Sequence, residues 1–401
     1  MTRSLTIVGT VLAFALLTLF LAIRKPVAMP LQHHANAPGD GGPFIAWKFS
    51  ADGAMFSSVT LAADGTVYGA STKGVYAISP DGRLKWHTQY GGSSYTALGS
   101  DGVLYAASAY GFIFGISPDG TVGWKPGYGL AGFKAPPAIS GSTVLFANNM
   151  SDLYAFEEGS ATEEWSQSTF REGAIAENVS LPGRAMASMT STASPAVYSD
   201  DSIALPRQHW LNLFGSDGSP TWNLQLTSGT LGAAALGDDG TIYVGDGQTL
   251  YAVDHSGSLK WQFKAPAGGC CLGSPVVDAD GTIYFAGGHS VFALLTDGTV
   301  KWSVTTKHQF QTSPTLAADG TLYIGAIREV VALNPDGSEK WVVTAPDSIT
   351  APSIGPDGTA YYVCGYAWIC AIRGISEPLM KSAWPEIHHD PANSGNVLTQ
   401  Y

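Results

Sequence analysis

The chain has 401 residues, of which 13% are charged, and its 32 acidic side chains against 20 basic ones give a formal net charge of −12. This balance excludes an extended basic surface, so we expect no nucleic-acid partner, because phosphate binding needs a positive footprint. The 48 glycines and 11% aromatic residues are typical of a folded β protein with frequent turns, and they exclude intrinsic disorder.

The amino terminus contains one long apolar segment, from Leu5 to Ile23. Its length suffices to cross a bilayer as a single helix. Because Pro26-Val27-Ala28 is a poor cleavage site, we interpret residues 1–30 as a signal-anchor with a transmembrane helix, and a cleaved signal peptide is the alternative. Residues 31–43 are rich in Gly and predict a flexible linker.

From residue 44 onwards the chain repeats one unit, which the segment Asp239 to Trp261 shows most clearly. Asp239-Gly240 and Ser256-Gly257 are turn sequences, and the β-branched and aromatic runs around them predict three short strands. A strand of small residues precedes them, as in Ser274 to Val277. Each unit ends on a tryptophan, and the series is Trp47, Trp86, Trp124, Trp165, Trp222, Trp261, Trp302 and Trp341.

A period of about 40 residues with four strands per unit predicts an all-β fold, an eight-bladed β-propeller of four-stranded antiparallel blades. After Trp341 the chain supplies only three strands, and the missing fourth is Phe44 to Phe49. We therefore expect the N-terminal strand to close the last blade, which removes the sheet edges. Residues 44–384 are assigned to the propeller and residues 385–401 to a C-terminal tail.

The segment Tyr76 to Trp86 and its copies that end at Trp261 and Trp341 resemble the tryptophan-docking repeat of the pyrroloquinoline quinone (PQQ)-like β-propellers, the superfamily of the quinoprotein alcohol dehydrogenases. The resemblance covers roughly residues 44–384 and implies an eight-bladed propeller. The tail from Trp384 to Pro391 resembles a terminal element of bacterial members. Function does not follow from the resemblance, because one propeller fold carries many activities.

The ligand face of such a propeller is formed by the loops between second and third strands and by the connections from a fourth strand to the next first strand. Unusual side chains in these loops predict a mixed aromatic and polar pocket near the axis, and ordinary loop packing is the alternative for each of them. The candidate ligand-binding residues are Cys270, Cys271, Arg207, His209, Trp210, Asp246, His289, His308, Arg328, Glu329, Tyr366 and Trp368.

The four cysteines fall into two pairs. Cys270 and Cys271 are adjacent, and we expect a vicinal disulfide, with free buried thiols as the alternative. In quinoprotein alcohol dehydrogenases a vicinal disulfide in a similar position lies against the quinone. Cys364 and Cys370 flank a hairpin loop, where neighbouring strands bring such a pair within bridging distance, so we expect a second disulfide. Two disulfides predict an oxidising compartment, with the propeller on the periplasmic side of the membrane that the N-terminal helix anchors.

Three functions are compatible with these patterns. The first is a monomeric, non-catalytic propeller that binds a protein partner or another extracytoplasmic ligand through its loop face. The second, implied by the resemblance, is a dehydrogenase that depends on PQQ and calcium. The Glu, Asn and Asp that hold calcium and act as the base in that family have no match here, so we assign no catalytic residue and favour a protein that is not an enzyme.

The third function is a carbohydrate-binding module that uses Trp210, Tyr366, Trp368 and the adjacent cysteines as flat surfaces.

A separate pattern concerns a metal site. His33, His34, His388 and His389 would suit a transition metal if the termini met. Since neither a strand nor a helix fixes their spacing, we assign no metal site.

Overall fold

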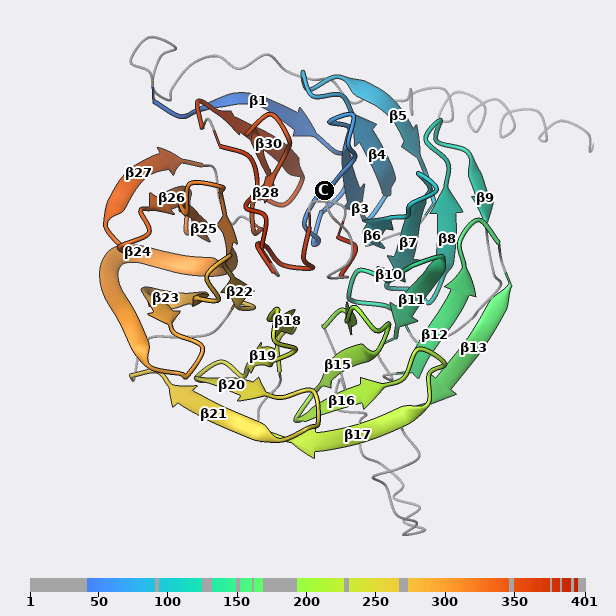
Figure 1. Ribbon diagram of the computed structural model, residues 1–401. Coiled ribbons are helices and arrows are strands. Elements are labelled where there is room, and N and C mark those ends of the chain that lie inside the picture. The colour runs from blue at the N-terminus through green and yellow to red at the C-terminus, as the bar shows by residue number, and fades with distance from the viewer. Residues whose placement is uncertain are drawn as a thin grey trace, which may run out of the picture.

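The computed structural model describes residues 42–90, 94–124, 132–148, 152–160, 162–168, 193–226, 231–266, 273–345, 350–375, 377–382, 384–390 and 393–395. Within these ranges the chain forms 30 strands and no helix. The strands form seven antiparallel sheets that stand as blades around a common axis (Figure 1). The protein is therefore an all-β propeller.

Five consecutive sheets have four strands each, in the order in which the chain supplies them. They are β2 (Thr60–Leu61), β3 (Val67–Ser71), β4 (Gly74–Ile78) and β5 (Leu84–Thr88); β6 (Ser94–Leu98), β7 (Leu104–Ser108), β8 (Ile113–Ile116) and β9 (Val122–Trp124); β10 (Ala138–Ser140), β11 (Thr143–Ala147), β12 (Asp152–Glu157) and β13 (Glu163–Ser168); β14 (Ala196–Val197), β15 (Ile203–Arg207), β16 (Trp210–Phe214) and β17 (Pro220–Gln225); and β18 (Ala235–Leu236), β19 (Ile242–Gly245), β20 (Thr249–Val253) and β21 (Leu259–Lys264).

The sixth sheet has six strands and the seventh has four. The sixth contains β22 (Val276–Val277), β23 (Ile283–Leu294), β24 (Val300–Leu316), β25 (Leu322–Ala326), β26 (Glu329–Leu333) and β27 (Glu339–Thr344). The seventh contains β28 (Ser353–Ile354), β29 (Ala360–Cys364), β30 (Trp368–Arg373) and β1 (Phe44–Ser50).

The prediction of eight separate four-stranded blades is wrong. Two of the predicted units share the six-stranded sheet, because β24 continues without a break from the end of one unit into the start of the next. Its first half pairs with β23, as in Trp302 with Ala293, and its second half pairs with β25, as in Thr315 with Tyr323. Counted by hydrogen-bonded sheets, the propeller has seven blades, and one of them is built from two sequence repeats.

The N-terminal strand closes the ring as predicted. β1 pairs antiparallel with β30, from Phe44 opposite Arg373 to Ser50 opposite Trp368. The first strand of the chain thus completes the sheet that its last three strands begin. This arrangement leaves the ring without a free seam between its two ends.

Tryptophans on the outermost strands hold neighbouring repeats together. The indole N–H of Trp261 donates to the carbonyl oxygen of Thr296 at 2.8 Å, and its ring lies over Gly298. A Cβ on Gly298 would lie 2.7 Å from the Trp261 ring, and its φ of 85° is in the left-handed region, so only glycine fits. Trp47, Trp86, Trp165, Trp222 and Trp302 dock on glycines of the following repeat in the same way.

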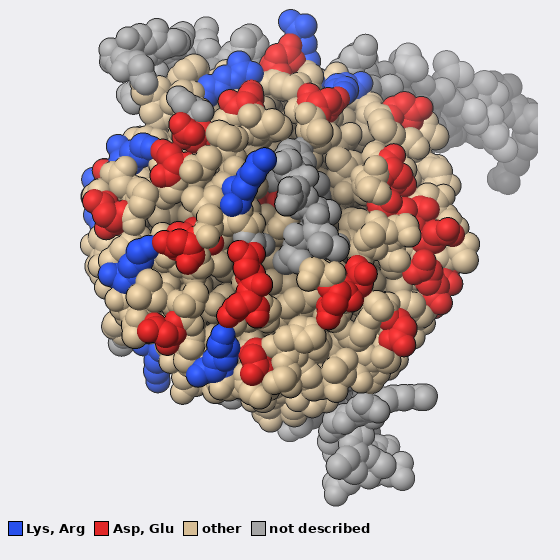
Figure 2. Space-filling model, viewed as in Figure 1, with Lys and Arg blue, Asp and Glu red and all other residues tan. Residues whose placement is uncertain are grey.

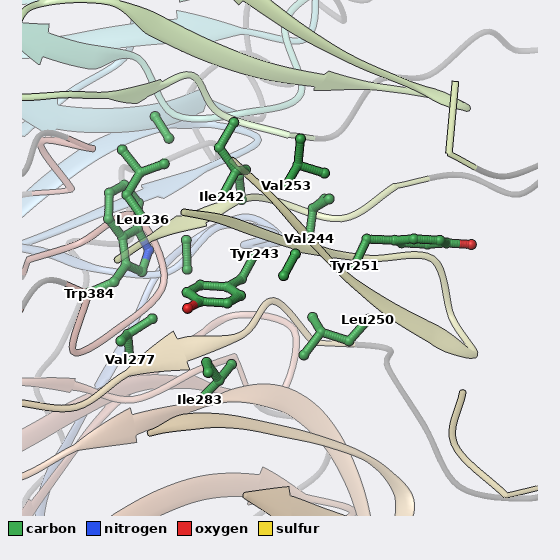
Figure 3. Packing of buried hydrophobic residues seen from close by; sticks show 14 of the residues in the cluster. Leu236, Ile242, Tyr243, Val244, Leu250, Tyr251, Val253, Val277, Ile283 and Trp384 are labelled. Atoms are coloured by element: carbon green, nitrogen blue, oxygen red, sulfur yellow. The ribbon is translucent and has the colours of Figure 1, made fainter. Parts of the chain in front are cut away.

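The core lies between the sheets. The second and third strands of the sheets are buried on both faces, as in β3 and β4, whereas outermost strands such as β21 alternate between exposed and half-buried residues. Figure 3 shows one such contact, in which Leu236 and Tyr243 of one sheet face Val277 and Ile283 of the next. Trp384, far along the chain, packs into the same cluster and is 1% exposed.

The predicted membrane anchor is corrected by the structure. None of the described residues forms a helix that is long and apolar enough to cross a membrane. The segment Leu5 to Ile23 itself, with the signal-anchor 1–30 and most of the linker 31–43, lies outside the described residues.

Candidate functional site on the loop face

Exposed aromatic side chains gather on the loop face. Because the strands are antiparallel, loops between second and third strands lie at the same end of the propeller as connections from a fourth strand to the next first strand. Five large aromatic residues in such loops are between 48% and 70% exposed, and we call them the aromatic rim. They are Phe56, Tyr90, Tyr110, Phe112 and Tyr366.

The rim follows three neighbouring sheets. Tyr366 lies between β29 and β30, and the N–H of Met55, next to Phe56, donates to the Tyr366 carbonyl oxygen at 2.7 Å. Tyr90 follows β5 and lies 6.4 Å, between ring centroids, from Phe114 of β8. Phe112 is two residues before Phe114, on the same face of the hairpin. These contacts place the Phe56 loop beside Tyr366 of the seventh sheet, and Tyr90 beside the second sheet, at the same end of the propeller.

Two rigid turns present the rim. In the loop from β7 to β8, the Ser108 hydroxyl accepts hydrogen bonds from the N–H groups of Tyr110 and Phe112, and Gly111 has a φ of 85°. In the loop from β29 to β30, a disulfide joins Cys364 to Cys370. Both turns therefore fix the backbone from which the aromatic side chains project before any partner arrives, which reduces the entropy lost on binding.

Another set of predicted residues forms an ion cluster on the six-stranded sheet. His308 of β24 is 3% exposed, and its Nδ1 lies 2.5 Å from Glu329 Oε2 while its Nε2 lies 2.9 Å from Glu339 Oε2. The Nδ1 of His289 lies 2.9 Å from the His308 carbonyl oxygen. Each ring nitrogen thus lies within hydrogen-bond distance of a carboxylate oxygen. The hydrogen bond from His308 lowers the pKa of Glu339.

Sequence reasoning found three members of this cluster, His289, His308 and Glu329, and missed Glu339. The signal for Glu339 was weak, since it directly follows an ordinary turn and begins β27, two residues before Trp341. The cluster ties β24 to β26 and β27, and it holds two acidic side chains around one buried ring. Among the described residues, no three His, Cys, Asp or Glu side chains are placed to hold a metal ion.

The remaining predicted residues do not converge with these. Arg207 and Trp210 face each other across the turn from β15 to β16, and burial lowers the pKa of Arg207 while Asp152 partly offsets this. Asp246 shapes a turn, since its carboxylate accepts hydrogen bonds from the N–H groups of Gln248 and Thr249.

Five further candidates remain. His209 lies in the turn from β15 to β16, and its carbonyl oxygen accepts a hydrogen bond from the Leu226 N–H. Arg328 is exposed at the tip of the turn from β25 to β26, with a φ of 61°. Trp368 begins β30 and is half-buried. Cys270 and Cys271 lie outside the described residues.

The C-terminal segment carries a second group of titratable side chains, and all of it is buried. Burial, reinforced by the Asp390 carboxylate, raises the pKa of Glu386 well above its usual value. Burial also lowers the pKa of His388 to about 4, although Asp390 partly offsets this. His389 is buried as well, whereas His33 and His34 lie outside the described residues, so the predicted four-histidine site stays without structural evidence.

Acidic residues dominate the surface charge. Figure 2 shows Asp and Glu spread over one face, with Lys and Arg more sparsely placed among them. This agrees with the net charge of −12. A surface of this kind repels phosphate backbones and leaves apolar contact as the main means by which the rim can bind.

The comparisons with known proteins agree with the fold. The sequence profile of the family described as outer membrane protein assembly factor BamB matches residues 71–235 and 208–355. No curated protein matches the chain in sequence.

Many solved structures are similar to this chain, and two of them illustrate the likeness. BamB from Moraxella catarrhalis has a TM-score of 0.64 at 15% identity, over 82% of this chain and 99% of that one. The quinohemoprotein alcohol dehydrogenase ADHIIG from Pseudomonas putida HK5 has a TM-score of 0.65 at 13% identity, over 90% of this chain and 80% of that one. At these identities each likeness shows the fold alone, and the predicted resemblance to the PQQ-like repeat propellers is confirmed.

Proposed function

Since the chain belongs to the family of outer membrane protein assembly factor BamB, we propose that it is a non-catalytic scaffold that binds a protein partner on its aromatic rim. The rim is the observation that carries the proposal. A protein ligand suits it because Tyr and Phe combine large apolar area with few rotatable bonds, which makes them common anchors of protein interfaces.

The size of the rim supports a specific contact. A buried Phe or Tyr covers roughly 150–250 Å², so five rings that are about half exposed present on the order of 500 Å² of aromatic surface. A patch of that size is at the upper end of what monomeric proteins leave uncovered. The opposite end of the propeller, formed by Asp-Gly turns such as Asp239-Gly240, presents polar groups instead.

Two observations bear on the nature of the partner. The rim is built from separate turns on three sheets, and a surface spread over several turns suits an extended or folded protein segment better than a small molecule. The Cys364–Cys370 disulfide, which supports the Tyr366 loop, is of the kind that persists in oxidising compartments.

A position-dependent crosslinking experiment tests the proposal. A photoreactive amino acid is placed at Tyr110 or Tyr366 on the rim, and at Leu259 or Val300 on outer strands, where the native side chains are 46% and 48% exposed. We expect adducts of one common mass from the two rim positions in living cells and none from the two controls.

A second variant makes the result specific. Replacing Tyr110 and Phe112 by Ser should remove the adduct formed from position 366 while leaving the melting temperature unchanged, because both side chains are exposed. Equal labelling at rim and control positions, or a rim without adducts, would count against a docking role for this surface.

A further inference from the structure

A cleft lies between the third and fourth sheets, at the end of the propeller opposite the aromatic rim. Its volume is about 250 Å³, and it is bounded by the turns from β10 to β11, from β14 to β15 and from β16 to β17. In an antiparallel sheet these turns lie at the other end from the loops between second and third strands. The cleft is therefore separate from the aromatic rim and does not depend on the proposed binding function.

The two turns that meet at the cleft are the ones that depart from the repeat. In every other repeat the turn from the first to the second strand is Asp-Gly, as in Asp64-Gly65 and Asp239-Gly240. The third sheet has Gly141-Ser142 in this turn, and the fourth has Asp200-Asp201. Residues of both turns line the cleft. Departures from the repeat that lie together in space indicate a local role, since the fold itself is made with Asp-Gly elsewhere.

Asp201 stands where the other repeats have glycine. Its N–H donates to the Tyr198 carbonyl oxygen, as the Gly240 N–H does to the Gly237 carbonyl oxygen, and its φ is 62° where Gly240 has 77°. A side chain disfavours this left-handed conformation, so the Asp201 carboxylate is kept at the cost of backbone strain. Such strain is concentrated at functional positions.

The Asp201 carboxylate is held from across the sheet boundary. The Ser140 hydroxyl, on the third sheet, donates to Asp201 Oδ1 at 2.6 Å, and both side chains are half-buried. Only Oδ1 of this carboxylate has a hydrogen-bond partner among the described residues, so Oδ2 can accept from a ligand. Ser142 and Ser216, both exposed, add hydroxyls that can donate and accept.

The rest of the lining is apolar or uncharged. Leu145 and Ile203, each 1% exposed, form its apolar part. None of the described lining residues is basic, so an anion would have no charge partner. The cleft is smaller than the roughly 300–1,000 Å³ of drug-sized ligand sites, which restricts it to one small molecule.

We propose that this cleft binds a neutral monosaccharide. A pyranose ring presents C–H groups on its faces and hydroxyls around its edge, which matches an apolar wall beside a carboxylate and several hydroxyls. Asp201 Oδ2 accepts from a sugar hydroxyl, Ser142 and Ser216 exchange further hydrogen bonds with the ring, and Leu145 and Ile203 face its C–H groups. The bond to the carboxylate is charge-assisted and therefore the strongest of these contacts.

Saturation-transfer NMR on the full-length protein tests the proposal with D-glucose, D-galactose and D-mannose, each added alone. We expect at least one of them to bind with a Kd on the order of 1 mM, as for other neutral ligands of about a dozen heavy atoms. Asp201→Gly restores the glycine of the other repeats and should keep the melting temperature within about 2 °C. It should weaken sugar binding about tenfold, because the charge-assisted bond is lost.

Two further variants make the result specific. Gln208→Gly is the matched control, since Gln208 also has a positive φ, of 43°, but lies in the turn from β15 to β16 at the other end of the sheet. Its sugar binding should equal that of the parent protein. Ser216→Trp places a large ring at an exposed position of the cleft and should abolish binding.

Three results would overturn the proposal. They are no saturation transfer to any of the three sugars, equal binding by the parent protein, Asp201→Gly and Ser216→Trp, and binding of ethylammonium in place of the sugars, which would make Asp201 the partner of a cation. Crosslinking from the aromatic rim in the Asp201→Gly variant should be unchanged, so failure of the sugar site and failure of the proposed function are distinguishable.

Discussion

Replacing Trp384 by Ala tests whether the C-terminal segment is part of the folded core. Trp384 is 1% exposed and packs against Leu236 and Val277, in the cluster that Figure 3 shows. Truncating a buried Trp to Ala costs about 3–5 kcal/mol, through lost transfer energy and the cavity that remains. The same change removes the indole N–H, which is buried without a described partner, and this relief offsets about 1 kcal/mol.

We therefore expect Trp384→Ala to lower the free energy of unfolding by about 3 kcal/mol. At about 2.1 cal/mol/K per residue over roughly 350 folded residues, this loss corresponds to a fall in melting temperature of about 4 °C. Trp384→Phe keeps an apolar ring and drops the unpartnered N–H, so its cost should be about 1 kcal/mol or less.

Urea denaturation followed by fluorescence and by circular dichroism gives both quantities, and coincident transitions check that unfolding is cooperative. Tyr110→Ala on the aromatic rim is the control, and its exposed side chain predicts a change within about 0.5 kcal/mol. If Trp384→Ala proved no more costly than this control, the segment would not be packed as described, and the reasoning from burial would be refuted.

Three further outcomes follow from contacts described above. Gly298→Ala should cost about 1–3 kcal/mol in urea titrations, since its Cβ meets the Trp261 ring, whereas Gly141→Ala, with a φ of 57° and no atom within 4 Å, should cost only the backbone strain of about 1 kcal/mol. The lowered pKa of Glu339 contributes stability that is present above pH 4.5 and is lost as the pH falls. Glu339→Gln should therefore make the free energy of unfolding depend less on pH in the acid range. An unchanged pH dependence would contradict the hydrogen bond from His308. Replacing both cysteines of the disulfide by Ala should cost about 2 kcal/mol for so short a loop, and equal stability in the two forms would show that it does not brace the hairpin.

The repeat made most of the fold predictable from the sequence. Turn glycines and β-branched runs mark strands locally, and a tryptophan every 40 residues or so reports a contact between neighbours. The pairing of the N-terminal strand, Phe44–Ser50, with the last sheet could be predicted because the last repeat supplies only three strands of its own. These features are local in sequence or repeated, which is why they could be found without coordinates.

The merged sheet escaped prediction because the repeat was taken to impose a break after every fourth strand. Connections elsewhere contain Gly and Pro, as in 125–132 and 265–273, whereas residues 303–312 contain neither. The absence of turn residues permits a continuous strand, and β24 runs through this segment. The sequence therefore contained a signal for the merged sheet, but the regular period was given more weight.

The functional surface was harder to predict than the fold. Of the aromatic rim, only Tyr366 was predicted, because polar and charged residues were weighted above exposed rings. Tyr110 and Phe112 flank Gly111 in the turn between the second and third strands of their repeat. In another repeat the same turn contains Asp246-Gly247. The replacement of a polar turn residue by aromatic ones could have identified Tyr110 and Phe112. The buried position of Glu386 had no such signal, since burial of a segment without periodicity depends on contacts far away in the chain.

The order in which the ring closes has a consequence for biosynthesis. The sheet that contains β1 cannot be completed before β30 is made, so the ring stays open while all the strands between them are synthesised. A product that stops short of Trp384 would also lack the contacts that residues 384–390 and 393–395 make with the inner strands of several sheets. Proteases and chaperones can therefore distinguish chains that contain this segment from chains that lack it.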